Sequence, residues 1–108
     1  MKLQVLFVKG GYYSLEDQKS LGYDVIGVDW TVQPEQARSI LGPDVIIQGN
    51  LDPCALYATK ADIKKLTNEM VKRFGTKKYI VNLGHGIYPD VAEENVEAFI
   101  EAVHDIKL

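Results

Sequence analysis

The sequence predicts an α/β fold in which four strand–helix units follow one another along the 108 residues. Short apolar runs alternate with stretches of helical periodicity, and glycine or proline separates most of them. Short apolar strands joined by helices are typical of a parallel sheet with right-handed crossovers. Because no linker or low-complexity segment interrupts the pattern, we expect residues 1–108 to form a single domain.

The first two units are predicted from two apolar runs. Strands are expected at residues 3–8 and 25–28, and helices at residues 14–21 and 34–41. The second helix begins with proline, whose missing N–H costs little in a first turn, and each helix stops at a glycine. Both units therefore have the expected start and stop signals.

The last two units have the longest helices. Strands are expected at residues 45–48 and 79–83, and helices at residues 60–74 and 92–105. Their apolar faces predict a buried side for each helix. These faces consist of Ile63, Leu66, Met70, Val71 and Phe74 in the first helix and of Val96, Phe99, Ile100 and Val103 in the second.

Four units correspond to half of a (β/α)8 barrel, which takes about 250 residues. An open half barrel exposes its inner side chains, each worth about 1.5–3 kcal/mol when buried, and it leaves two sheet edges unpaired. We therefore expect one of three solutions: a second copy completing an eight-stranded barrel, a flavodoxin-like sheet with a helix across the open face, or a separate N-terminal half. The homodimer is favoured slightly.

Composition excludes several classes of protein. The net charge of −3 and the pI near 5.3 argue against a nucleic-acid-binding surface. No apolar run approaches a membrane span, and no signal peptide is recognisable. The single cysteine, Cys54, rules out an internal disulfide or a multi-cysteine metal site. We expect a cytoplasmic protein without nucleic-acid or membrane partners.

The predicted strands all end on one rim, where α/β proteins carry their sites. This places the loops at residues 9–11, 29–31, 48–53 and 84–88 together. The pair Gly10-Gly11 has neither dinucleotide-binding nor P-loop spacing. The prediction is a site on this rim with no nucleotide cofactor.

His85 is the main candidate for chemistry on the rim. It stands between Gly84 and Gly86, which leave room for a ligand to approach the backbone. An imidazole can hydrogen-bond a carboxylate or relay a proton, whereas the structural alternative is a hydrogen-bonded turn histidine. His104, near the end of the last helix, is expected to interact favourably with the helix dipole.

Other polar residues at the strand ends are expected to be mainly structural. Asp29 and Asp52 suit loop-holding or helix-capping acceptors better than catalytic acids. A buried or half-buried thiol is the favoured interpretation of Cys54. The neutral amides could orient a substrate but more commonly bond neighbouring loops, and the aromatic residues could pack on a macrocycle but more commonly pack on the scaffold. These residues are Gln48, Asn50 and Asn82, and Tyr12, Tyr13, Tyr57 and Tyr88.

Three blocks resemble the C-terminal part of the uroporphyrinogen decarboxylase family. They are GVDWTV at residues 27–32, QGNLDP at residues 48–53 and YIVNLGHGIYPD at residues 79–90, in the family's order and spacing. The similarity extends from about Phe7 to the end of the chain. It implies the last four units of the family's TIM barrel, with Gly84, His85 and Gly86 lining a substrate cavity.

The resemblance also implies an activity. The family converts uroporphyrinogen to coproporphyrinogen by removing four acetate carboxyl groups, and it uses no cofactor. Its central aspartate and paired arginines belong to the first half of the barrel and match nothing here. Zinc-using relatives need a His-x-Cys and a second cysteine, so no metal is expected.

Two functions from different classes follow from this resemblance. In the first, the chain is the C-terminal half of the decarboxylase and is poorly active or inactive alone. In the second, it is a dimerising half barrel that binds a tetrapyrrole or serves as a scaffold.

Overall fold

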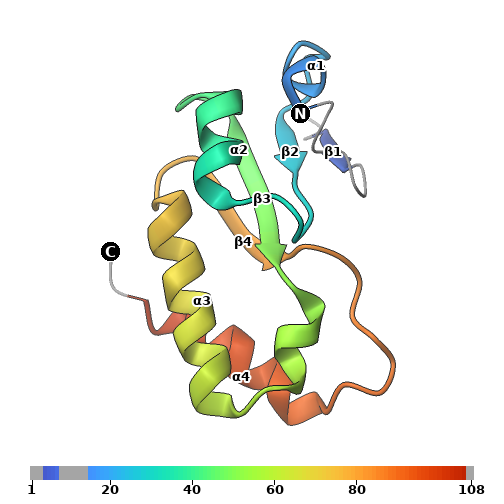
Figure 1. The fold of residues 1–108 in the computed structure, drawn as a ribbon, viewed down its shortest axis with the longest axis vertical. Helices are drawn as coiled ribbons and strands as arrows, with labels where there is room; N and C mark the ends of the chain where they lie inside the picture. The colour runs from blue at the N-terminus through green and yellow to red at the C-terminus, as the bar shows by residue number, and fades with distance from the viewer. Residues whose placement is uncertain (1–3, 8–14, 107–108) are drawn as a thin grey trace.

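The computed structural model describes residues 4–7 and 15–106 and contains one four-stranded parallel sheet (Figure 1). Each strand pairs with the next along the chain, giving the order β1-β2-β3-β4. The predicted parallel sheet is therefore confirmed. The strands are β1 (Val5–Phe7), β2 (Val25–Gly27), β3 (Ile46–Leu51) and β4 (Tyr79–Leu83).

The helices alternate with the strands as predicted. They are α1 (Leu15–Lys19), α2 (Pro34–Leu41), the short 3-10 helix η2 (Pro53–Tyr57), α3 (Lys60–Phe74) and α4 (Glu93–His104). The predicted limits of α2, α3 and β4 are confirmed. Within the part of the chain that the structure describes, no helix has the length and apolar character needed to cross a membrane.

Strand β3 is longer than predicted. It starts at Ile46 and continues through Gly49 and Asn50 to Leu51, because this stretch pairs with β4 up to Leu83. Gly49 and Asn50 are residue types typical of turns, but pairing with β4 makes them part of the strand. Conversely, β1 is assigned only over Val5–Phe7, and residues 3 and 8 of its predicted range lie outside the described residues.

The sequential strand order decides between the open alternatives for the sheet. A flavodoxin-like sheet places its first strand between the second and third. Here β1 lies at one edge and β2 pairs with both β1 and β3. The chain therefore keeps the arrangement of a half barrel.

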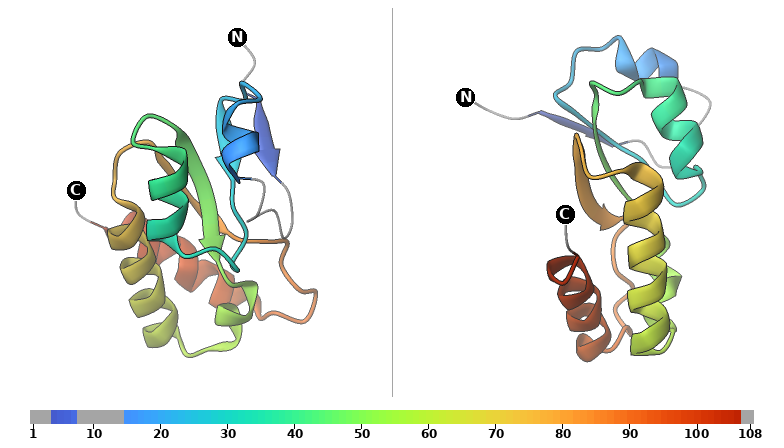
Figure 2. Two further views of the ribbon diagram at one scale, coloured as in Figure 1. Left: turned by 45° about the horizontal axis from the view of Figure 1, so that its top comes forward. Right: turned by 90° about the vertical axis from the view of Figure 1, so that its left-hand side faces the viewer.

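Helices α2 and α3 lie over one face of the sheet, and α4 packs against α3 and η2. Figure 2 shows α2 and α3 on the same side of the strands. Leu66 and Ile100 are exceptions to the predicted apolar faces: both are exposed, because each lies at the margin of its stripe beyond the covered surface. The fully buried large side chains include Ile26, Leu41, Ile47, Leu56 and Ile63.

The opposite face of the sheet, which would be the inside of a barrel, is open and apolar. Phe7, Gly27, Gln48 and Ile80 are register partners across the four strands. Phe7 covers Gly27, since a β-carbon placed on that glycine would lie 2.9 Å from the Phe7 ring. Val5, Phe7 and Ile80 remain 45%, 43% and 39% exposed, which matches the expectation for an incomplete barrel.

Arg38 joins the units at the end of the sheet away from the rim. Its guanidinium donates to the carbonyl oxygens of Gly42 and Val45 at 3.2 and 2.7 Å. It also donates to those of Lys77 and Lys78 at 3.3 and 3.1 Å. One side chain therefore connects the end of α2, the start of β3 and the connection into β4.

Candidate functional site

The carboxyl ends of β2, β3 and β4 meet at one rim, as predicted. The Gly84 amide donates to the carbonyl oxygen of Leu51 at 2.7 Å, which joins the ends of β3 and β4. The rings of Trp30 and His85 lie with their centroids 5.7 Å apart and their planes at 89°. The predicted loop at residues 9–11 and the tyrosines 12 and 13 lie outside the described residues.

Gly84 and Gly86 differ in the space around them. A β-carbon on Gly84 would lie 2.5 Å from the Trp30 amide nitrogen and 3.0 Å from the Asn50 carbonyl oxygen, so only glycine allows this contact between loops. A β-carbon on Gly86 would meet nothing within 4 Å. The backbone beside His85 is therefore packed on one side and open on the other.

His85 is exposed and lines a cavity of about 460 Å³ at the rim of the open sheet face. The cavity combines apolar and amide side chains with the imidazole. Gln48 and Asn82 belong to it, so two of the predicted amides lie beside His85. The complete lining is Phe7, Gln48, Asn82, Leu83, His85, Gly86 and Ile87.

Asp29 and Asn50 hold the loop between β2 and α2. Asp29 is only 2% exposed, and its Oδ1 accepts hydrogen bonds from the Thr31 amide at 3.0 Å and the Thr31 hydroxyl at 2.5 Å. The buried Asn50 Nδ2 donates to the carbonyl oxygens of Asp29 and Val32 at 2.7 and 2.6 Å. Their expected loop-holding roles are confirmed.

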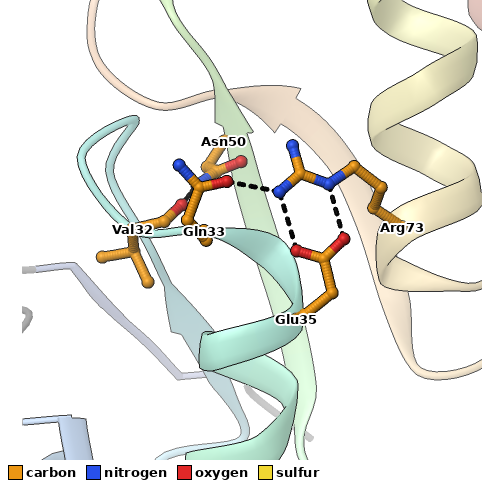
Figure 3. Close-up of polar contacts among 5 residues, drawn as sticks. All are labelled: Val32, Gln33, Glu35, Asn50 and Arg73. Atoms are coloured by element: carbon orange, nitrogen blue, oxygen red, sulfur yellow. Dashed lines mark hydrogen bonds and ion pairs between the residues drawn. The ribbon is translucent and has the colours of Figure 1, made fainter.

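Arg73, which the sequence analysis missed, fixes the other end of this loop (Figure 3). Its Nε and Nη2 donate to the two Glu35 carboxylate oxygens at 2.6 and 2.7 Å, and Nη2 also donates to the Gln33 side chain. The guanidinium holds the pKa of Glu35 down at about 2. Because η2 displaces the start of α3, the last turn of α3 lies level with the first turn of α2, an offset that no local sequence pattern indicates.

Comparison with known proteins agrees with this geometry. A family model described as uroporphyrinogen decarboxylase (URO-D) matches residues 3–106. The chain belongs to the uroporphyrinogen decarboxylase family.

Curated relatives named uroporphyrinogen decarboxylase are close in sequence. The proteins of Ovis aries and Homo sapiens are 53% and 51% identical over 100 residues, which is 93% of this chain and 27% of each relative. The Danio rerio protein is 54% identical over 101 residues, 94% of this chain and 27% of its own length. The chain thus spans about a quarter of the length of these uroporphyrinogen decarboxylases.

A solved structure confirms the fold class. A methyltransferase from Methanosarcina mazei superposes with a TM-score of 0.81, covering 94% of this chain and 30% of that protein. At 22% identity this similarity establishes the shared fold alone. The URO-D family assignment therefore rests on the family model and the closer relatives.

Cys54 departs from its predicted burial in this URO-D family member. The thiol is exposed, because Cys54 lies in the first turn of η2 and not in a core helix. Asp52 caps that turn as predicted, accepting a hydrogen bond from the Cys54 amide at 2.9 Å. His104 also lies where predicted, exposed in the last turn of α4.

Two of the predicted tyrosines pack on each other. The rings of Tyr57 and Tyr88 stack with centroids 6.2 Å apart. The Tyr57 hydroxyl donates to the Asp90 carboxylate, and this bond raises the pKa of Tyr57 to about 12. The contacts anchor the far end of the long loop that carries His85 and support the scaffold interpretation of these aromatics.

Proposed function

We propose that this chain supplies part of the substrate-binding rim of a uroporphyrinogen decarboxylase, with His85 contacting a carboxylate of the tetrapyrrole. The main supporting observation is the position of His85, exposed beside a cavity of about 460 Å³ on the open face of the sheet. The relatives that match 93–94% of this chain are named for the same enzyme.

The lining of the cavity suits one part of such a ligand. Phe7, Leu83 and Ile87 offer apolar surface to a macrocycle edge, while His85 and Asn82 offer hydrogen bonds to a carboxylate. Apart from the imidazole when protonated, none of the lining residues carries a formal charge. A ligand with eight carboxylates therefore needs further partners beyond this surface.

Catalysis is expected to need groups that this chain does not match. The family's aspartate and paired arginines are assigned by resemblance to the preceding half of the barrel. Losing one preorganised electrostatic element commonly costs about 100- to 1000-fold in rate. We therefore expect the chain alone to bind a tetrapyrrole weakly and not to decarboxylate uroporphyrinogen at an enzymatic rate.

The open face also supports a partner in this proposal. Val5, Phe7 and Ile80 are more than one-third exposed, and β1 and β4 are the two edges of the sheet. A second copy could cover these residues, and so could the remainder of a longer chain. We favour the homodimer for the isolated chain and a cytoplasmic location.

Porphyrin titration tests the proposal directly. Trp30 is the one tryptophan of the sequence and contacts His85, so its fluorescence should be quenched when uroporphyrin binds at the rim. His85→Ala should weaken binding, whereas His104→Ala removes the other histidine, on α4, and should bind as wild type. Equal affinities in all three proteins would leave His85 as a turn residue.

An anaerobic assay with uroporphyrinogen tests the expected lack of turnover. No coproporphyrinogen should form with the purified chain. Appreciable product without a partner chain would overturn this part of the proposal.

A further inference from the structure

The imidazole of His85 lacks restraining neighbours along its own backbone. Gly84 and Gly86 carry no side chains, so the ring depends on another element for a wall. Trp30 provides that wall from the loop between β2 and α2, edge to face and 5.7 Å away between centroids. The orientation of His85 is therefore coupled to the position of the Trp30 loop.

The Asn50 side chain, on β3, is hydrogen-bonded to that loop. Its Nδ2 donates to the carbonyl oxygens of Asp29 and Val32, which bracket Trp30, at 2.7 and 2.6 Å. The Asn50 carbonyl oxygen also lies next to Gly84, 3.0 Å from where its β-carbon would be. Asn50 thus lies between the two segments that carry the rings.

Arg73, on α3, is hydrogen-bonded to the end of the same loop and to the start of α2. Gln33 is the last residue of the loop and Glu35 lies in the first turn of α2, and both accept hydrogen bonds from the Arg73 guanidinium (Figure 3). Two of these bonds form a bidentate pair, which fixes direction as well as distance. The last turn of α3 therefore restrains the start of α2.

The loop has space to move if these contacts are lost. A cavity of about 170 Å³ lies beside it, lined among others by Trp30, Asn50 and Arg73. Neither Asn50 nor Arg73 lines the larger cavity that contains His85. Their effect on a ligand would therefore be indirect.

We propose that Asn50 and Arg73 are positioning residues for His85, acting through the 29–33 loop and the Trp30 ring. The inference rests on the proposed role of His85 in carboxylate binding. Asn50 and Arg73 would then support the imidazole without lining the cavity that contains it.

Nuclear magnetic resonance of the histidine ring protons tests the inference without any ligand. The chain has two histidines, so His85→Ala assigns both sets of signals. The indole ring current should displace the His85 signals, and Trp30→Leu defines that displacement. Arg73→Ala and Asn50→Asp should move them toward the Trp30→Leu position, while the His104 signals stay unchanged.

Lys72→Ala is the matched control for Arg73→Ala. It removes one positive charge from the preceding residue of α3, on an exposed side chain. Its His85 signals should coincide with those of wild type. Wild-type signals in folded Arg73→Ala would overturn the role of Arg73, and insensitivity to Trp30→Leu would overturn the coupling altogether.

Uroporphyrin affinity links the geometry to binding. Arg73→Ala should weaken uroporphyrin binding by about 10-fold. This is the smaller end of the loss in affinity seen in other proteins when a residue that supports a metal ligand is removed. Combining it with His85→Ala should add no further loss, because both act through one group. Weaker binding in His85→Ala but not in Arg73→Ala would overturn the inference.

The two proposals fail in distinguishable ways. Unchanged affinity in both variants, together with a displaced His85 signal in Arg73→Ala, would refute the proposed function and support the positioning of the ring. Unchanged His85 signals in Arg73→Ala, together with weaker uroporphyrin binding in His85→Ala, would support the proposed function and refute the positioning of the ring.

Discussion

Asn50 and Asn82 are register partners on neighbouring strands, yet only one of them is buried. Asn50 is 6% exposed under the loop that follows β2, and its amide donates to two carbonyl oxygens. Asn82 is exposed on the cavity wall and accepts a hydrogen bond from the Leu83 amide at 2.8 Å. Identical residues at one level of the sheet therefore serve different purposes.

Asn50→Asp should strongly destabilise the chain. The substitution replaces the donating amide with a carboxylate that faces two carbonyl oxygens, and we expect a loss of about 2–4 kcal/mol in the free energy of unfolding. Asn82→Asp keeps an acceptor for the Leu83 amide and should change stability by less than about 0.5 kcal/mol. Urea unfolding measures both, and equal losses would contradict this assignment.

Gly84→Ala should perturb the rim far more than Gly86→Ala. The added methyl group on Gly84 would meet the backbone of Trp30 and Asn50, which cannot turn aside, and overpacking of this kind costs about 1–3 kcal/mol. The same change at Gly86 enters open space. Thermal unfolding of the two variants gives the comparison, and matching midpoints would show that the loops separate readily.

The pair of Glu35 and Arg73 should make stability depend on acid pH. The guanidinium lowers the pKa of Glu35 from 4.5 to about 2, so the folded state binds fewer protons than the unfolded state between these values. The stabilisation is present above pH 4.5 and is lost as the pH falls towards 2.

Glu35→Gln removes the titrating group and should flatten the pH dependence of unfolding in that window. Arg73→Ala should flatten it similarly, because it removes the cause of the shift. Because the side chains are 43% and 58% exposed, high salt should weaken the effect in wild type. Parallel curves for wild type and Glu35→Gln would contradict the prediction.

The open sheet face should control the oligomeric state of the isolated chain. Ile80→Asp places a charge where a second copy would pack, and we expect sedimentation to show dissociation to monomers. Ile100→Asp makes the same change on α4, at a residue that is 47% exposed and away from the strands. It should leave the mass unchanged, and a monomeric wild type would rule out the dimer.

Local signals were sufficient to predict most of the fold. Proline at position 34 and the glycines that follow both helices gave the limits of α2 and α3, since these residues act through their own backbone. The extension of β3 to Leu51 was not predicted, because pairing with a strand about thirty residues later decides it. The exposure of Leu66 likewise depends on what packs nearby.

The candidate site was predictable only in part. The setting of His85 between glycines placed it on the rim correctly, and the loop-holding function of Asp29 followed from its position after a strand. The role of Arg73 could not be predicted, since it depends on the displacement of α3 relative to α2. Nor did any local pattern indicate that Cys54 would face solvent.

The single side chain of Arg38 is hydrogen-bonded to segments of three strand–helix units, at the end of the sheet opposite His85. Loss of that guanidinium would remove four hydrogen bonds between these units at once, although the Lys78 carbonyl oxygen would keep the Ile47 amide as a donor. At the rim, by contrast, the loops are held by several side chains, among them Asp29, Asn50 and Arg73. A change in one of the rim loops therefore leaves the Arg38 contacts at the opposite end of the sheet in place.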